Sequence, residues 1–259
     1  MVEPVPLSTR AVARSDTGQV RRRNEDAVRV AGSRGALVVA DGMGGHPAGD
    51  VASALAAEEA FHRLLEIPVG LPAEEVSAAA LGERMGELVR KADERVREGI
   101  REDPSLDGMG TTLTAMLLDA GRGRAFLGHV GDSRAYRLRD GVLELLTRDH
   151  TWVQEQVDQG RLSPAQARAH PYASVLTRVL GLEGPVQPDV VDVEALPGDV
   201  FLLCSDGLTA MLTDPDIEAT LNAGLPEGID AAADALVRAA NEEGGVDNIT
   251  VALLAVERS

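Results

Sequence analysis

Four aspartates stand where strongly apolar runs meet a turn, and this placement constrains the fold more than any other feature of the sequence. They are Asp41, Asp132, Asp206 and Asp247. Three of them neighbour a glycine, whose turns expose backbone carbonyl oxygens, and hard divalent cations prefer several oxygen ligands. A single Asp-Gly pair is an ordinary turn. The repeated pattern at rigid strand ends indicates a site for Mg2+ or Mn2+ with oxygen ligands only.

Hydrophobic periodicity predicts strands and helices in separate groups, which is typical of an α+β fold. Strands are predicted over residues 36–40, 111–118, 124–130, 135–138, 142–146, 190–193, 200–204 and 249–256, and helices over 50–66, 85–100, 151–160, 163–170, 215–221 and 229–241. Asp140-Gly141 has the composition of a hairpin turn, and Ser163 followed by Pro164 that of a helix N-terminus. Since no linker or internal repeat interrupts the pattern, we expect one domain over residues 1–259.

The charge balance argues against one class of partner. The chain has 42 Asp and Glu against 25 Lys and Arg, a formal net charge of -17, which is a poor surface for a nucleic acid. Cys204 is the single cysteine, so no disulfide forms within the chain and a thiolate zinc site is excluded, which suits a cytoplasmic location. No apolar run is long enough to cross a bilayer, so we expect no membrane insertion.

A set of short motifs follows the order and spacing found in one enzyme family. The motifs are Arg21, Asn24-Glu25-Asp26, Asp41-Gly42-Met43-Gly44-Gly45-His46, Gly110-Thr111-Thr112, Gly131-Asp132-Ser133-Arg134, Ser205-Asp206-Gly207 and Asp247-Asn248-Ile249-Thr250. Over almost its whole length the chain resembles the bacterial metal-dependent (PPM, type 2C) serine/threonine protein phosphatases. The resemblance implies a four-layer αββα sandwich, with two antiparallel sheets flanked by helix pairs and a helical flap over about residues 147–185. We expect the acidic residues to gather at one edge between the sheets.

The resemblance also implies a role for each site residue. Asp41 would bridge two Mg2+ or Mn2+ ions, Glu25 and the Gly42 carbonyl would hold one of them, and Asp206 and Asp247 the other. Asp132 and Asp206 would bind a third, weaker ion. Asp26 and Asn248 would support these ligands from behind. Arg21 would bind the phosphate, and His46 would protonate the leaving alkoxide.

The implied reaction is the hydrolysis of phosphoserine and phosphothreonine in proteins, with attack by a water that the two ions activate. The partners would be phosphorylated proteins and a cognate serine/threonine kinase, and the chain would act as a monomer. Arginine suits the phosphate role because its planar fork binds two oxygens at once. Taken alone, the run Arg21-Arg22-Arg23 is an ordinary solvated basic stretch.

Two other interpretations remain open at this point. A non-catalytic or regulatory module that binds a phosphoprotein would be expected to lack a ligand, whereas Glu25, Asp41, Asp206 and Asp247 are all present. An enzyme for an anti-sigma-antagonist regulator or a small phosphoester would be expected to have a reduced flap. Within the flap, Ala173-Ser174 stands where many relatives carry Arg-Asn. We interpret His62, His129, His150 and His170 as structural, and Cys204 as buried packing.

Overall fold

The computed structural model describes residues 7–43, 48–70, 76–182 and 184–258. One sheet has the order β1 (Leu7–Asp16), β11 (Ile249–Arg258), β10 (Val200–Cys204), β7 (Arg134–Arg139) and β8 (Val142–Leu145). The other has the order β2 (Asp26–Ala31), β3 (Ala36–Met43), β5 (Leu113–Asp119), β6 (Arg124–Val130) and β9 (Asp189–Glu194), with β4 (Gly110–Thr111) paired to β3. The strand pairs of both sheets are antiparallel.

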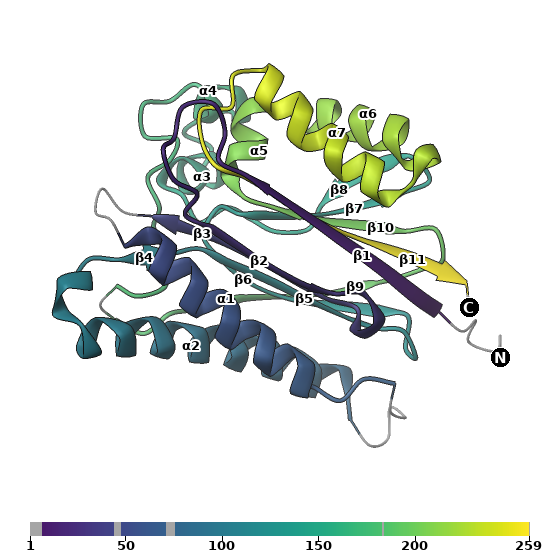
Figure 1. Cartoon of the computed structure of the whole chain (residues 1–259), viewed down its shortest axis with the longest axis horizontal. Helices are drawn as coiled ribbons and strands as arrows, with labels where there is room; N and C mark the ends of the chain where they lie inside the picture. The colour runs from purple at the N-terminus through teal and green to yellow at the C-terminus, as the bar shows by residue number, and fades with distance from the viewer. Residues whose placement is uncertain (1–6, 44–47, 71–75, 183, 259) are drawn as a thin grey trace.

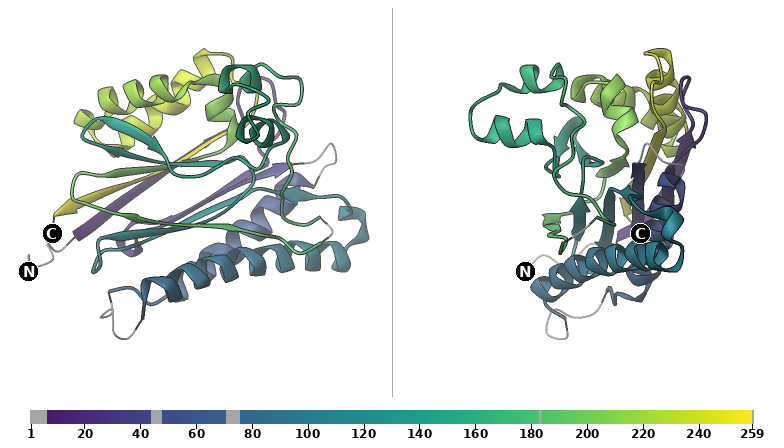
Figure 2. Two further views of the ribbon diagram at one scale, coloured as in Figure 1. Left: turned by 180° about the vertical axis from the view of Figure 1, so that it is seen from behind. Right: turned by 90° about the vertical axis from the view of Figure 1, so that its left-hand side faces the viewer.

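Helices cover the outer faces of the two sheets. The helices of the described residues are α1 (Gly49–Glu66), α2 (Ala78–Glu102), α3 (Trp152–Asp158), α4 (Pro164–Arg168), α5 (Asp206–Met211), α6 (Asp214–Gly224) and α7 (Ile229–Glu242), with 3-10 turns η1 (Gly32–Arg34), η2 (Pro104–Leu106) and η3 (Leu225–Glu227). The pair α1 and α2 packs on the sheet that contains β3, and α6 and α7 pack on the sheet that contains β11 (Figure 1). The predicted four-layer αββα arrangement is confirmed. Figure 2 shows α3 and α4 projecting to the side of the sandwich.

The alternation of side chains along β3 explains how a charged residue reaches the space between the sheets. Val38 and Ala40 belong to the apolar core beneath α1 and α2, whereas Leu37 and Val39 face the other sheet. Because strand side chains alternate with a period of two, Asp41 follows Leu37 and Val39 on the inter-sheet side. The apolar layer between the sheets therefore ends in an acidic residue at this edge.

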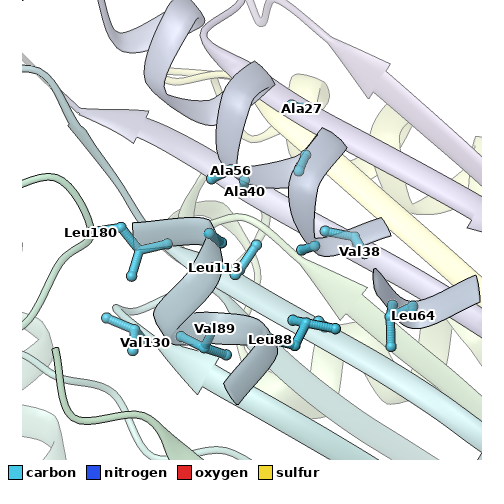
Figure 3. Close-up of a cluster of buried hydrophobic side chains, with 14 of the residues drawn as sticks. Ala27, Val38, Ala40, Ala56, Leu64, Leu88, Val89, Leu113, Val130 and Leu180 are labelled. Atoms are coloured by element: carbon cyan, nitrogen blue, oxygen red, sulfur yellow. The ribbon is translucent and has the colours of Figure 1, made fainter. Parts of the chain in front are cut away.

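Small side chains bring α1 close to its sheet. Ala56 and Leu64 of α1 pack with Val38 and Ala40 of β3, while Leu88 of α2 joins the same cluster (Figure 3). These side chains are at most 2% exposed, so they contribute about 1.5–3 kcal/mol for each large apolar residue. This core fixes the start of α1 beside the end of β3, where the acidic residues lie.

Elements with strong local sequence signals were predicted more accurately than the weaker strands. Asp140 and Gly141 have φ values of 51° and 81°, as a tight hairpin requires, and Ser163 forms a capping box at α4. The sequence patterns did not predict β1, β2 or α5, and α2 starts earlier than expected, at Ala78. None of the described helices is both long and apolar enough to span a membrane.

Candidate active site

Carboxylates from both sheets meet at one edge of the sandwich. Asp26 and Asp41 lie opposite each other in the β2–β3 ladder, and Asp206 opens α5 directly after β10 and Ser205. The carboxyl groups of Asp41 and Asp206 face each other within hydrogen-bonding reach. Asp132, in the turn after β6, faces the same group, and its charge acts on Asp41. The expectation that the acidic residues gather between the sheets is thus confirmed for these four.

The electrostatics of this group are unfavourable for negative charge. Burial raises the pKa of Asp41 and of Asp132 well above the usual range of an aspartate, and neighbouring carboxylates raise both further. Burial and the Asp247 carboxylate likewise raise the pKa of Asp206, and burial raises that of Asp26 to about 7. Desolvation and like charges both disfavour the ionised form. Such a cluster gains stability from any cation that it can bind.

The Ser205 hydroxyl, which lies directly after β10, holds Asp26 in place. The Ser205 hydroxyl donates to Oδ2 of Asp26 over 2.7 Å and accepts the Thr250 N–H over 3.0 Å. The second carboxylate oxygen, Oδ1, is buried and has no hydrogen-bond partner among the described residues. A buried acceptor without a donor is costly, and a nearby cation would compensate for it.

Two threonines of the Gly110-Thr111-Thr112 motif fix the backbone of Asp41. The Thr112 hydroxyl accepts the Asp41 N–H over 3.0 Å, and the Thr111 hydroxyl donates to the Asp41 carbonyl over 2.8 Å. The Thr112 hydroxyl also lies 2.7 Å from the Ser133 hydroxyl, next to Asp132. The motif therefore ties the backbones of Asp41 and Asp132 into one frame, a contact that the sequence alone did not reveal.

Glu25 and Gly42 approach a common point at the start of α1. The Glu25 N–H donates to Oδ1 of Asn248 over 2.8 Å, and the Ser53 hydroxyl donates to the Glu25 carbonyl over 2.5 Å. A Cβ placed on Gly49 would lie 2.7 Å from Oε2 of Glu25 and 3.0 Å from the Gly42 carbonyl oxygen. The carboxylate and the carbonyl predicted to share one ion therefore point toward the same place.

Asn248 and Arg21 connect the loop before β2 to the loop before β11. The Asn248 amide donates to the carbonyls of Thr17 and Arg23 over 3.0 and 2.8 Å. Nη2 of Arg21 donates to Oδ2 of Asp247 over 2.5 Å. Arg21 thus lies beside the acidic group, but its partner here is a predicted metal ligand. Its role toward phosphate stays a prediction.

The structure leaves some predicted features untested. His46 lies outside the described residues. Among the residues that are described, no three Asp, Glu, His or Cys side chains meet closely enough to enclose a cation by themselves. A site of the predicted kind would also use the Gly42 carbonyl and water, because Mg2+ keeps several waters in its shell.

The comparisons with known proteins agree with this arrangement. Residues 17–248 match the family described as Protein phosphatase 2C. The chain belongs to this family. It is 44% identical over 248 residues to the serine/threonine protein phosphatase PstP of Mycobacterium tuberculosis, covering 95% of this chain but only 45% of that protein. It is 38% identical to the serine/threonine phosphatase stp of Listeria monocytogenes, with 93% of each chain covered.

A solved structure gives the same fold. The catalytic domain of PstP, in complex with two manganese ions, superposes with a TM-score of 0.82 and 40% identity, covering 97% of this chain and 99% of that one. The chain spans about half the length of the full PstP sequence.

Several residues of this protein phosphatase 2C family member support the site without having been predicted to do so. The Ser205 hydroxyl donates to Asp26 and the Thr250 N–H donates to that hydroxyl, although both residues were quoted only as parts of motifs. Their position in the sequence is the signal that could have identified them. Ser205 directly precedes Asp206, and Thr250 lies two residues after Asn248. Cys204 is fully buried, as predicted, and burial raises the pKa of its thiol to about 12, so it stays protonated.

Proposed function

We propose that the chain hydrolyses phosphoserine and phosphothreonine in proteins, using Mg2+ or Mn2+ ions and a water nucleophile. The observation that carries this proposal is the group of enclosed carboxylates Asp26, Asp41, Asp132 and Asp206, whose pKa values are all raised at one edge between the sheets. Negative charge gathered in this way is stabilised by bound cations and is typical of a metal centre.

The donors present fit hard divalent cations. They are carboxylate oxygens and a backbone carbonyl, with no thiol among them, and they include the buried Oδ1 of Asp26, which has no hydrogen-bond partner among the described residues. Oxygen-only ligation favours Mg2+ or Mn2+. The family relative with two manganese ions supports the same choice.

In this proposal the roles follow the sequence predictions. Asp41 would contribute to holding both ions, Glu25 and the Gly42 carbonyl would hold one of them, and Asp206 and Asp247 would hold the other. Asp132 and Asp206 together would hold a third, weaker ion. Asp26 and Asn248 fix these ligands from behind.

Bound divalent cations supply an acidic water and neutralise charge on the phosphate. Arg21 orients the phosphate, because a guanidinium has five N–H donors and can bind a second anion while it keeps Asp247. His46 gives a proton to the departing serine or threonine oxygen. A flap over about residues 147–185 borders the site within a single domain.

We also propose the substrates, the location and the oligomeric state of the enzyme. Its substrates are phosphorylated proteins, it opposes a bacterial serine/threonine kinase in the cytoplasm, and it acts as a monomer. The net charge of -17 supports a partner other than nucleic acid.

A phosphatase assay tests the proposal. Wild type, Asp206→Ala and the control Asp192→Ala are compared on a phosphothreonine peptide, with Mn2+ and with a chelator. Asp192 pairs with Arg124 over 2.8 Å and lies on β9, outside the acidic group. We expect wild type and the control to be active with Mn2+ only, and Asp206→Ala to lose at least about 100-fold. Metal-independent activity, or an unchanged Asp206→Ala, refutes the proposal.

A further inference from the structure

His150 bonds both peptide units that flank the Cα of Gly131. The His150 backbone N–H donates to the Gly131 carbonyl over 2.7 Å, and the Gly131 N–H donates to Nδ1 of the His150 imidazole over 3.1 Å. The imidazole is fully buried. Gly131 immediately precedes Asp132, so these two hydrogen bonds fix the backbone from which the Asp132 carboxyl projects.

The far side of the imidazole is fixed as well. Nε2 of His150 lies 3.1 Å from Oδ2 of Asp189, and Nη1 of Arg178 donates to the other Asp189 oxygen over 2.8 Å. Since a carboxylate only accepts, Nε2 must carry the proton, and Nδ1 is then the acceptor that the Gly131 N–H requires. Asp189 thus selects the one neutral tautomer that can bind Gly131.

Thr112 lies against the other side of Gly131. The φ of Gly131 is +111°, and a Cβ at this position would lie 2.5 Å from Cβ and Cγ2 of Thr112. Thr112 in turn contacts the Ser133 hydroxyl and the Asp41 N–H. The turn that carries Asp132 is therefore held between Thr112 on one side and His150 on the other.

We propose that His150 is a positioning residue for Asp132: its imidazole fixes the Val130–Gly131 peptide and its backbone N–H fixes the Gly131–Asp132 peptide, and together they set the direction of the Asp132 carboxyl relative to Asp206. The inference rests on the proposed function, in which Asp132 and Asp206 hold the third ion. Hydrogen-bonded partners that orient metal ligands typically change metal affinity by 10–100-fold when they are removed.

The neighbouring His129 provides a matched control. Its ring centroid lies 4.9 Å from that of His150, and it is equally buried, but its ring nitrogens contact the Thr114 hydroxyl and the Arg148 carbonyl instead of Gly131. Because the two buried rings are neighbours, substitution of either histidine disturbs the same part of the interior. Only substitution of His150 removes the acceptor for the Gly131 N–H.

Calorimetric titration of the chelator-treated, dialysed full chain with Mn2+ tests the inference. Asp132→Ala first identifies the weak site as the one that it weakens. We expect His150→Leu to weaken the same site by about 10-fold or more, while the tighter sites stay within about twofold of wild type. His150→Asn keeps an acceptor near the Nδ1 position and should recover most of the loss, whereas His129→Asn should leave the weak site unchanged.

Nitrogen NMR of labelled histidine supplies a readout that needs no metal. The neutral tautomer with the proton on Nε2 is expected for His150, and a mixture of tautomers is expected in Asp189→Ala. If His150→Leu does not fold, Asp189→Ala, which removes the partner of Nε2, carries the comparison and should also weaken the weak site.

Three results overturn the inference: a proton on Nδ1 of wild-type His150, weak-site affinity that is unchanged in His150→Leu (or in Asp189→Ala, where the Leu variant does not fold) although Asp132→Ala lowers it, or equal loss in His129→Asn. If the wild type takes up no Mn2+, the proposed function itself fails and this inference falls with it, whatever the tautomer.

Discussion

Replacing Asp26 by asparagine should make the metal-free protein more stable, although the residue lies in the active site. The Ser205 hydroxyl donates to Oδ2 of Asp26, whereas Oδ1 has no partner among the described residues. Burial raises the pKa of Asp26 from its ordinary value of 3.8 to about 7. A tenfold change in proton affinity is worth about 1.4 kcal/mol, so the ionised carboxylate costs the folded state at most about 4 kcal/mol at high pH. Asparagine has the same shape, can accept from Ser205 and carries no charge.

The pH dependence gives the sign of this effect. Because the pKa of Asp26 is higher in the folded state, its contribution to the stability of the wild type is fully present below pH 3.8 and is lost as the pH rises through about 7. The difference in free energy of unfolding between Asp26→Asn and wild type should therefore grow by about 2–3 kcal/mol between pH 5 and pH 8.

Urea denaturation in the presence of a chelator, followed by circular dichroism, measures this difference. Asp107→Asn, an exposed position, serves as the control and should show the pH dependence of the wild type. A variant that is less stable than wild type at pH 8, or a difference that does not change with pH, would refute the electrostatic reasoning.

Three further predictions concern the frame around the acidic group. Thr112→Val leaves the buried Asp41 N–H without its acceptor and should cost about 1–3 kcal/mol in urea denaturation, with reduced phosphatase activity; unchanged values for both would contradict the frame. Gly131→Ala combines a φ of +111° with a 2.5 Å contact to Thr112 and should destabilise by about 1–3 kcal/mol, so a neutral effect would show that the turn is not rigid. Arg21→Lys keeps the charge but loses the planar fork, and we expect kcat/KM for a phosphopeptide to fall by about 10-fold or more while Mn2+ affinity changes little; equal activity would remove Arg21 from phosphate binding.

The sequence predicted the parts of the fold that have strong local signals. The apolar run before Asp41 and the capping signal at Ser163 are encoded within a few residues, so both were found. The strand β1 was missed because its side chains are mostly half-buried, and Ala and Arg in it give little alternation. It forms because all ten of its residues pair with β11, a contact between the two ends of the chain that no local pattern reveals.

The site shows the same division. Asp41, Asp132, Asp206 and Asp247 stood out because each lies where an apolar run meets a turn, whereas Glu25 and Asp26 were assigned only from the family resemblance. The hydrogen bonds of His150 did not, since they depend on two segments 19 residues apart that meet only in the folded structure. From the sequence alone, a histidine within an apolar region is interpreted as a structural residue. Its contact with Gly131 forms because folding brings the turn after β6 next to the segment that follows β8.

The central claim is that carboxylates from both sheets converge to bind divalent cations, and counting the ions tests it most directly. Calorimetric titration of the chelator-treated chain with Mn2+ should give at least two sites in the wild type, and Asp41→Ala should abolish tight binding because Asp41 is shared between two ions. Uptake of no ions by the wild type at millimolar Mn2+, or binding that is the same in Asp41→Ala, would contradict the account.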